Sequence, residues 1–289
     1  MFTAVTIEDA DGAEVALFDG QRRLGEVHGL HGLPAPRKIE RTRPGAHGTI
    51  NETRHYASRQ PVWNGTLLGS DASALWTLYD TILQALWGAV SEPRVMRWTR
   101  EDGTQLQSVV KLGDAFDPVI RATDAGRYLA YQLVLDREDP RNYSQTLRSE
   151  ASTVLTSGGG GWVFPEIMPV IFTPTGSGVA TTANNGSIPT PATFTIVGQI
   201  SNPQILQVET GKVIVLSGEV GAGSTLVVNG ATRTVLLDGV TDRSNLVNFA
   251  STDWEAAMIP PGGATYRLLA TSWDATAKLD PITSRDAYA

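Results

Sequence analysis

Residues 193–237 read TFTIVGQISNPQILQVETGKVIVLSGEVGAGSTLVVNGATRTVLL. Short runs of Val, Ile, Leu and Thr alternate in this stretch with turn pairs such as Asn202-Pro203 and Asn229-Gly230. Runs of this length, bounded by Gly, Pro and Asn, are typical of β-strands joined by tight turns. The pattern therefore predicts an all-β sandwich or jelly roll.

The same strand pattern extends over residues 165–289, which we assign to a C-terminal β-sandwich. Four consecutive glycines at 158–161 cannot hold one conformation cheaply, and they predict a Gly-rich linker over residues 151–164. The length of 289 residues is about twice that of a typical domain. An N-terminal domain over residues 1–150 accounts for the remainder.

The N-terminal domain is expected to hold strands and a single helix, over about residues 71–87. Ser70 or Asp71 can cap this helix, and Gly88 can end it. We expect two apolar stripes to bury much of its circumference. One stripe comprises Leu75, Leu78, Tyr79, Ile82 and Leu86, and the other comprises Trp76, Leu83 and Trp87. The predicted fold class is mainly β, with an N-terminal β-sandwich or split-barrel-like domain.

Composition excludes several classes of protein. A hydrophobic content of 41% and 18% charged residues describe a folded chain. No stretch approaches the roughly 20 apolar residues needed to span a bilayer, and the acidic start lacks the basic region of an export signal. With no cysteine there is no disulfide or thiolate metal site. A net charge of −7 argues against nucleic-acid binding, which needs a basic face.

Charge is distributed unevenly along the N-terminal domain. Residues 1–21 carry a net charge of −5, and residues 22–59 carry +5. Two solvated strand faces would explain the contrast, and so would complementary surfaces that meet between copies of the chain. Under the second hypothesis the candidate interface residues are Glu8, Asp9, Asp11, Arg37, Lys38, Arg41 and Arg43.

No motif for catalysis, cofactor binding or metal binding stands out. The four histidines lie within residues 28–55, in segments that are expected to be extended, where positions i and i+3 face opposite sides. The glycine runs lack the strand–helix context of a phosphate loop, and there is no Gly-x-Ser-x-Gly elbow. We predict no catalytic, cofactor or metal site. The histidines are His28, His31, His47 and His55.

Two weaker hypotheses concern carbohydrate. Carboxylates of the C-terminal domain could form a glycosidase pair, although acids at turn positions are more often turn formers. Trp254 and Trp273 could stack on sugars, although packing near a turn is expected for Trp254. The carboxylates are Asp238, Asp242, Asp253 and Glu255.

An ordered set of short motifs runs through the chain. It begins with Asp139-Pro-Arg-x-Tyr143 and continues with an Asn-x-Gly, an Asn-Pro turn, a Thr-Gly hairpin and a Trp ahead of a Pro-Gly turn. In order and spacing this set resembles distal tail (Dit-type) proteins of long-tailed, siphovirus-like bacteriophages. Gly263 departs from the family, which usually has Asn there. The C-terminal motif positions are Asn184 or Asn185, Gly186, Pro191, Gly198, Asn202, Pro203, Thr210, Gly211, Trp254, Pro261 and Gly262.

The resemblance implies a ring-forming N-terminal domain with one helix and a peripheral galectin-like β-sandwich. Such rings, commonly hexameric, join the tail tube to the central tail-tip hub. The implied partners are therefore further copies of the chain, the tail tube protein and the hub protein. The implied location is the virion tail tip, or baseplate, after assembly in the bacterial cytoplasm.

The galectin sugar site does not carry over with the fold, because it uses a His and the C-terminal domain has none. We therefore expect a structural protein rather than an enzyme. The alternative is a carbohydrate-binding tail or surface module that contacts the host cell.

Overall fold

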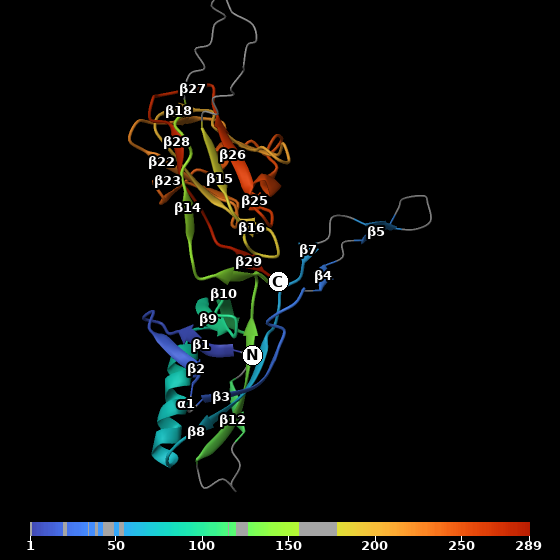
Figure 1. Cartoon of the computed structure of the whole chain (residues 1–289), viewed down its shortest axis with the longest axis vertical. Helices are drawn as coiled ribbons and strands as arrows, with labels where there is room; N and C mark the ends of the chain where they lie inside the picture. Colours follow the sequence, from blue (N-terminus) through green and yellow to red (C-terminus); the bar gives the residue numbers. More distant parts are fainter. Residues whose placement is uncertain are drawn as a thin grey trace, which may run out of the picture. The chain divides into compact units, whose positions relative to one another are not determined.

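The computed structural model of the chain describes residues 2–19, 22–33, 35–37, 40–42, 49–51, 55–114, 116–119, 127–155 and 178–289 (Figure 1). The chain divides into two units, each with its own hydrophobic core. Unit 1 comprises Met1–Gln145 and Tyr288–Ala289, and unit 2 comprises Thr146–Ala287.

The chain passes between the units twice. Strand β14 (Arg148–Glu150) pairs with β28 (Lys278–Ser284), so the residues that follow Gln145 already belong to unit 2. Near the C-terminus, β29 (Ala287–Tyr288) pairs with β13 (Asn142–Ser144), and Tyr288 and Ala289 belong to unit 1. The glycine run 158–161 lies outside the described residues, and so does most of the linker predicted there.

Unit 1 is built on one antiparallel sheet with the order β2-β1-β9-β10-β12-β8-β3, with β11, β13 and β29 paired off this path. The end strands β2 and β3 are consecutive in the chain and contact each other, so the sheet is nearly closed and barrel-like. The strands are β1 (Phe2–Glu8), β2 (Glu14–Phe18), β3 (Arg22–His28), β8 (Val62–Leu68), β9 (Arg94–Arg100), β10 (Gln105–Leu112), β11 (Asp117–Val119) and β12 (Tyr128–Asp136).

The inner face of this sheet follows the alternation of each strand. In β8, Trp63 and Leu67 are buried and the residues between them point outward, apart from Gly65. Gly65 faces Tyr131 of β12, and a Cβ on Gly65 would lie 2.3 Å from the Tyr131 ring. The glycine therefore makes room for an aromatic ring inside the barrel-like sheet.

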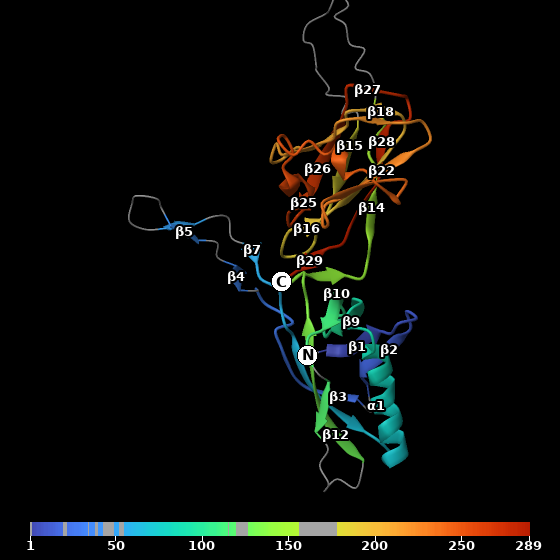
Figure 2. The same cartoon turned by 180° about the vertical axis from the view of Figure 1, so that it is seen from behind.

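Helix α1 (Ala72–Leu86) begins and ends where the sequence predicts. The Asp71 side chain accepts a hydrogen bond from the Ala74 N–H at 2.9 Å, and Gly88 takes a left-handed φ of 81° just beyond the last turn. The helix packs against β2 and β8, and Figure 2 shows it beside β2. Leu75 and Ile82 are buried on the packed face. At 15 residues, α1 is too short to cross a membrane, and no other helix of the described residues qualifies.

The described residues within 33–57 of unit 1 form two small strand pairs, and we call this segment the arm. In it β4 (Pro36–Arg37) pairs with β7 (His55–Tyr56), and β5 (Glu40–Thr42) pairs with β6 (Thr49–Asn51). Within the described residues neither pair joins the main sheet.

Unit 2 is a β-sandwich in which two antiparallel sheets enclose one core. Phe194 of one sheet and Tyr266 of the other meet edge to face, with ring centroids 4.8 Å apart. One sheet has the order β14-β28-β17-β22-β23-β24, in which β17 is Thr193–Val197, β22 Thr225–Asn229, β23 Thr234–Leu237 and β24 Thr241–Asp242. The other has the order β15-β26-β19-β20, at Val179–Thr182, Ala264–Leu269, Gln204–Gln207 and Val213–Val215.

Short elements connect these strands. They are β16 (Thr190–Pro191), β18 (Ile200–Ser201), β21 (Glu219–Val220), β25 (Met258–Ile259), β27 (Ser272–Trp273) and the 3₁₀ turns η1 (Ser244–Leu246) and η2 (Trp254–Ala257). The predicted fold class, mainly β with one helix beside the N-terminal sheet, is confirmed for the described residues. The galectin-like detail stays a prediction.

Candidate assembly interface

The acidic candidate residues lie on the β1–β2 hairpin, and two of them have partners within the chain. Arg97 Nη2 donates to Glu8 Oε1 at 2.5 Å. The Asp9 carboxylate accepts the backbone N–H groups of Asp11 and Ala13, each at 2.9 Å, and so closes the turn. The Asp11 side chain is exposed. Of these three acids, Asp11 is the one the fold itself does not use.

The basic candidate residues belong to the arm. Arg37 is in β4 and Arg41 is in β5, while Lys38 and Arg43 lie outside the described residues. The structure therefore assigns the acids and the bases to different elements of unit 1. Whether the two sets meet between copies stays a prediction.

Our expectation that the second apolar stripe of α1 is buried is wrong for its two tryptophans. Trp87 is 82% exposed and Trp76 is 45% exposed, whereas we expected both to be buried. A residue is rotated by about 100° from its neighbour along a helix, so one sheet cannot cover both stripes. The sheet covers the stripe of Leu75 and Ile82, and the tryptophans lie beside it.

An apolar groove lies at the C-terminal end of α1, and we call it the α1 groove. It has a volume of about 460 Å³, and the described residues that line it carry no charge. Val90, one of the lining residues, is 70% exposed. The lining residues are Leu83, Leu86, Trp87, Gly88, Val90, Leu112 and Phe116.

A ladder of aromatic rings joins this surface to the core. Trp76 meets Tyr79 edge to face at 5.5 Å between ring centroids, Tyr79 stacks on Phe116 at 5.7 Å, and Phe116 contacts Tyr131 at 5.3 Å. Tyr131 is buried among the β-strands. The floor beside the groove is thus held by packed rings, as a preformed contact surface requires.

Two buried arginines, Arg59 and Arg137, lie elsewhere in unit 1. Among the hydrogen bonds of the described residues, neither guanidinium group donates to a carboxylate. Arg59 Nη1 donates to the Leu30 carbonyl at 3.1 Å, and Arg137 Nη2 donates to the Arg141 carbonyl at 2.6 Å. Burial, and next the charge of Arg59, lowers the pKa of Arg137 to about 10. The backbone carbonyls therefore compensate charges that the sheet has taken out of water.

The Asp139-Pro-Arg-x-Tyr motif folds around one carboxylate. Asp139 accepts the Tyr143 hydroxyl at 2.6 Å and the Arg141 backbone N–H at 3.0 Å. Burial and the Asp139 charge raise the pKa of Tyr143. Asn142, which is fully buried, donates to the Leu30 carbonyl at 3.1 Å and to the Ala289 carbonyl at 3.2 Å. This motif fixes the strand that receives the C-terminal residues.

The Asn-x-Gly motif does the equivalent work in unit 2. Asn184 is fully buried, and its amide bonds the carbonyls of Ile188 and Ile259 and the N–H groups of Gly186 and Ala287. A Cβ on Gly186 would lie 1.9 Å from the Ala287 carbonyl oxygen, so only glycine fits there. The motif residues are structural ties.

The two histidines whose side chains the structure describes, His28 and His31, do not share a site. His28 is exposed, with Nε2 3.3 Å from Glu26 Oε2, and the His31 ring stacks on Phe2. His47 lies outside the described residues. No group of three or more His, Asp or Glu residues that could hold a metal occurs within the part of the chain that the structure describes.

The carboxylates proposed for glycoside hydrolysis each have a local partner. Asp238 accepts the Thr225 N–H at 2.8 Å, and Asp242 accepts the Ser244 N–H at 2.8 Å. Asp253 caps η2 by accepting the N–H of Glu255 at 2.9 Å. Glu255 is also paired with Lys212. These roles are those of turn formers.

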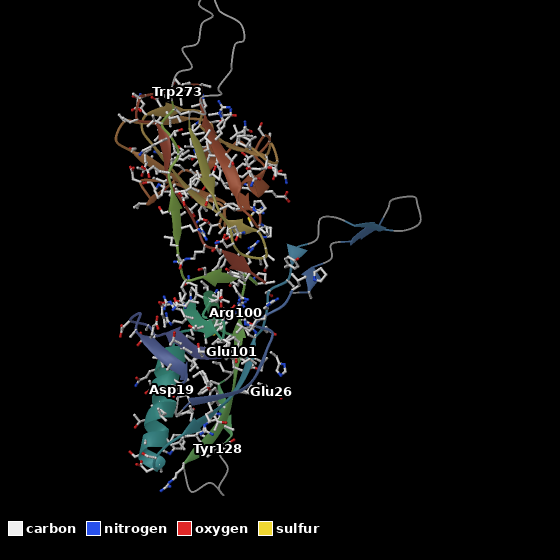
Figure 3. The ribbon with its side chains drawn as sticks, in the orientation of Figure 1. Asp19, Glu26, Arg100, Glu101, Tyr128 and Trp273 are labelled. Carbon is white, nitrogen blue, oxygen red and sulfur yellow. The ribbon has the colours of Figure 1, made fainter. Side chains whose placement is uncertain are left out.

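The two C-terminal tryptophans differ. Trp254 is half-buried and packs on the core of unit 2, as expected. Trp273 is 36% exposed in β27 (Figure 3). It borders a pocket of about 530 Å³ with Val154 and Leu155. Of the two tryptophans, Trp273 is the one that remains a candidate for stacking on a sugar.

One family model matches part of the chain. Residues 185–279 match the family model described as the C-terminal domain of a siphovirus-type tail component. The resemblance to Dit-type proteins is thereby confirmed. The match covers most of the unit 2 sandwich and includes the Gly186, Asn-Pro and Thr-Gly motif positions.

Solved structures extend the likeness to both units. The chain matches the Dit protein (gp 19.1) of phage SPP1, described as a paradigm of the hub adsorption apparatus in phages that infect Gram-positive hosts, with a TM-score of 0.61 at 15% identity. That match covers 99% of each chain, and it shows a Dit-like fold. A chain of the phage P2 baseplate in its activated, Ca-containing conformation matches with a TM-score of 0.48 at 10% identity, over 98% of this chain and 97% of that one. No curated protein sequence matches the chain.

Proposed function

We propose that this chain is a structural protein of a phage tail tip, or baseplate, whose copies form a ring that joins the tail tube to the central tail-tip hub. The observation that carries the proposal is the siphovirus-type tail family match of unit 2, on a chain whose whole fold is Dit-like. The ring is proposed to be a hexamer, located in the virion tail tip and assembled in the host cytoplasm. Its role rests on interfaces rather than on catalysis, and it needs no cofactor.

Two features of unit 1 support self-association. The strand pairs of the arm join no larger sheet within the described residues, and an isolated two-stranded ribbon is at best marginally stable in water. The α1 groove exposes Trp87, and exposed apolar patches on folded proteins commonly mark interaction sites. A neighbouring subunit would satisfy both features.

A ring needs a heterologous contact, in which two different surfaces of the same chain meet at every interface. The charge contrast between residues 1–21 and 22–59 offers one such pair of surfaces. Exposed ion pairs contribute only about 0–1 kcal/mol each, so charge would set register and rate while apolar contacts supply most of the affinity.

The test is the mass of the purified full-length chain, measured by native mass spectrometry or mass photometry. The expected result is a discrete species near six times 30.9 kDa. A different closed number would revise the ring order. A monomer at every concentration would refute the ring.

Binding of the tail tube and hub proteins is tested separately. Each is co-expressed with the full chain, and co-purification on the assembled species is expected for both. If neither associates with an intact ring, the joining role is wrong although the ring stands.

The second candidate function is host-glycan binding by unit 2, and it is favoured only by the part-exposed Trp273. Its neighbour Asp274 is already engaged, because its carboxylate accepts the N–H groups of Gln199 and Thr276. The Thr271 hydroxyl, which also lines that pocket, donates to the Ser201 carbonyl at 3.1 Å. Binding on a glycan array that is lost in Trp273→Ala, together with a monomeric mass, would reverse the ranking.

A further inference from the structure

We propose that residues 288–289, which we call the latch, complete unit 1 only after unit 2 has folded. Unit 2 holds Ala287 in place and thereby brings Tyr288 to β13 of unit 1. A copy whose unit 2 is unfolded therefore carries an unfinished unit 1. The inference concerns the order of folding within one chain, and it goes beyond the proposed ring without depending on it.

The first step is that the latch belongs to the fold of unit 1. Strand β29 pairs with β13, and the Tyr288 side chain packs against the core of unit 1. The Arg100 guanidinium lies over the Tyr288 ring, 5.9 Å from its centroid. The buried Asn142 side chain donates to the Ala289 carbonyl at 3.2 Å. The latch therefore completes the surroundings of β13.

The second step is that the residue before the latch is fixed in unit 2. Ala287 is fully buried, its N–H donates to Asn184 Oδ1 at 3.3 Å, and its carbonyl accepts the Ile188 N–H at 3.2 Å. One residue earlier, the Asp286 carboxylate accepts two hydrogen bonds from Arg148, at 2.8 and 2.9 Å. Because consecutive Cα atoms are about 3.8 Å apart, a fixed Ala287 leaves the next residue little freedom of position.

The third step is the distance along the chain. Asn142 and Ala289 are 147 positions apart in sequence. Closing a flexible loop of that length costs chain entropy, and a strand of two residues makes few contacts to offset the cost. The latch alone is therefore a weak closure for an unfolded chain.

Folding of unit 2 removes most of that loop. In the β14–β28 ladder, Arg148 is the partner of Ser284, and ladder partners lie about 5 Å apart. Residues 145–147 join β13 to β14, and residues 285–287 join β28 to the latch. Once β14 and β28 pair, only these two short connections separate the latch from β13, so its effective concentration there rises steeply.

The order of folding follows from these connections. Strand β9 pairs with β1 and β10, which all come from the first 112 residues, so this part of the unit 1 sheet needs nothing from unit 2. The pairing of β13 with β29 needs residues that a folded unit 2 brings close. We therefore expect β9 to form independently and β13 to be protected only together with unit 2 or after it.

The first experiment lengthens the connection between unit 2 and the latch. A flexible Gly-Ser-Gly-Ser-Gly-Ser spacer is inserted between Ala287 and Tyr288 of the full chain, so that no side chain is lost. We expect hydrogen–deuterium exchange of a peptide covering residues 142–144 to quicken by at least about tenfold, because the spacer lowers the effective concentration of the latch at β13. Exchange of β9 and β17 amides should stay unchanged.

Two further variants calibrate this measurement. Tyr288→Ala removes the ring that packs on unit 1 and should expose β13 at least as much as the spacer does. The matched control carries the same spacer between Val240 and Thr241, at a turn of unit 2 where Val240 is 84% exposed, and it should leave β13 unchanged.

Three results would overturn the inference. One is wild-type exchange of β13 in the Ala287–Tyr288 spacer variant, because docking of the latch would then not depend on its connection to unit 2. Another is wild-type exchange of β13 in Tyr288→Ala. The third is a loss of β13 protection in the Val240–Thr241 control while β17 stays protected.

The second experiment follows the order of folding directly. The full chain is refolded from urea, and pulses of deuterium label the amides that are still unprotected at each time. Phe194 is fully buried in unit 2, and any change of rate that Phe194→Ala causes in β17 should appear in β13 and not in β9. If this variant cannot fold unit 2, β13 should stay unprotected while β9 becomes protected.

The matched control is Phe249→Ala, because Phe249 is 70% exposed in unit 2, and it should change none of these rates. Protection of β13 before β17, or protection of β13 in a chain whose unit 2 stays unfolded, would refute the latch. The ring is judged separately by mass. A monomeric chain with this folding order refutes the ring alone, and a ring whose β13 ignores the spacer refutes the latch alone.

Discussion

The two units bury polar groups in different ways. Among its described residues unit 1 buries three arginines, of which Arg59 and Arg137 are held by backbone carbonyls. Unit 2 buries mainly amides and hydroxyls, and its buried acid Asp286 has a bidentate partner in Arg148. Burying charge is costly and burying a hydrogen-bonded amide is not. The fold of unit 2 therefore depends less on buried charge than the fold of unit 1.

The exposed apolar residues point the same way. In unit 1, Trp87 and Val90 share one groove. In unit 2 the most exposed ones lie on separate segments, with Leu147 before β14, Val240 between β23 and β24, and Phe249 after η1. Scattered apolar residues are ordinary, whereas a groove that gathers them is typical of a surface that another molecule covers.

The largest expected effect tests the hydrogen bonds of a buried amide in unit 2. Asn184→Ala removes an amide that serves four backbone groups, in two buried and two part-buried hydrogen bonds, and leaves them without that partner. At about 1–3 kcal/mol for each orphaned group, we expect unit 2 to lose about 4 kcal/mol or more. The measurement is hydrogen–deuterium exchange of β17 and β28 amides in the full chain, where protection should fall while β9 is unaffected.

The neighbouring asparagine supplies the control. Asn185 is exposed, and Asn185→Ala should change the same protection by less than about 0.5 kcal/mol. Equal losses in the two variants would mean that the Asn184 amide is not what ties the C-terminal strand into unit 2.

The next prediction separates the two faces of α1. Ile82 is fully buried, so Ile82→Ala should cost unit 1 about 2–5 kcal/mol through lost burial and a cavity. Trp87→Ala removes a larger side chain, yet it should cost below about 0.5 kcal/mol in the monomer because Trp87 is 82% exposed. Urea unfolding at low protein concentration measures both, and a Trp87→Ala loss near that of Ile82→Ala would refute the exposed groove.

Helix α1 also shows how far the sequence could predict this fold. Its limits and its packed face follow from local signals: the Asp71 cap, Gly88 and apolar spacing. The exposure of Trp76 and Trp87 does not, because it depends on how many layers cover the helix, and that is a tertiary fact. Spacing reports that a stripe is apolar and not whether its own chain or another covers it.

The candidate interface was less predictable than the fold. The unequal charge of residues 1–59 suggests acidic and basic surfaces, which stays a prediction, and it does not indicate that Arg97 engages Glu8. Long-range partners such as Arg137 with the Leu30 region leave no local pattern. The Asp139-Pro-Arg-x-Tyr and Asn-x-Gly motifs can be read in the sequence, and they carry the resemblance to Dit-type proteins. The sequence does not indicate that these residues hold strands together through hydrogen bonds.

The third prediction concerns the charge that unit 2 does bury. Burial alone would raise the pKa of Asp286, but hydrogen bonds from Arg148 and the Asn185 N–H outweigh it, so the pKa lies below its ordinary value. A lowered carboxyl pKa stabilises the fold above the unfolded pKa, near 3.9, and that stability is lost as pH falls through the folded pKa. Arg148→Ala should cost about 2 kcal/mol at neutral pH.

The sign of this effect is checked by titration. The Arg148→Ala loss, measured by exchange of β28 amides, should shrink as pH falls toward about 4 and Asp286 becomes protonated in the variant. A loss that is the same at neutral and acidic pH would mean that Arg148 stabilises unit 2 by packing rather than by charge.

The smallest expected effect returns to unit 1 and its positive charges. His31 stacks on Phe2 with ring centroids 5.6 Å apart, and its pKa is lowered by burial and then by Arg100, Arg137 and Arg59. A histidine with a lowered pKa is protonated at a lower pH in the folded chain than in the unfolded chain, where its pKa is near 6.5. The unfolded chain binds more protons below that pH, so unit 1 should lose stability as pH falls from about 6.5.

His31→Gln should remove that part of the acid sensitivity while leaving stability at pH 8 little changed, because His31 is neutral there in both states. The measurement is exchange of β1 and β9 amides between about pH 8 and 5.5, with unit 2 as internal control because it holds no histidine. If wild type and variant lose protection in parallel, the arginines around His31 are too well screened by solvent to disfavour its charge. In that case the buried arginines of unit 1 would not measurably shift the pKa of a neighbouring group. The exposed α1 groove would then be the remaining difference between the two units.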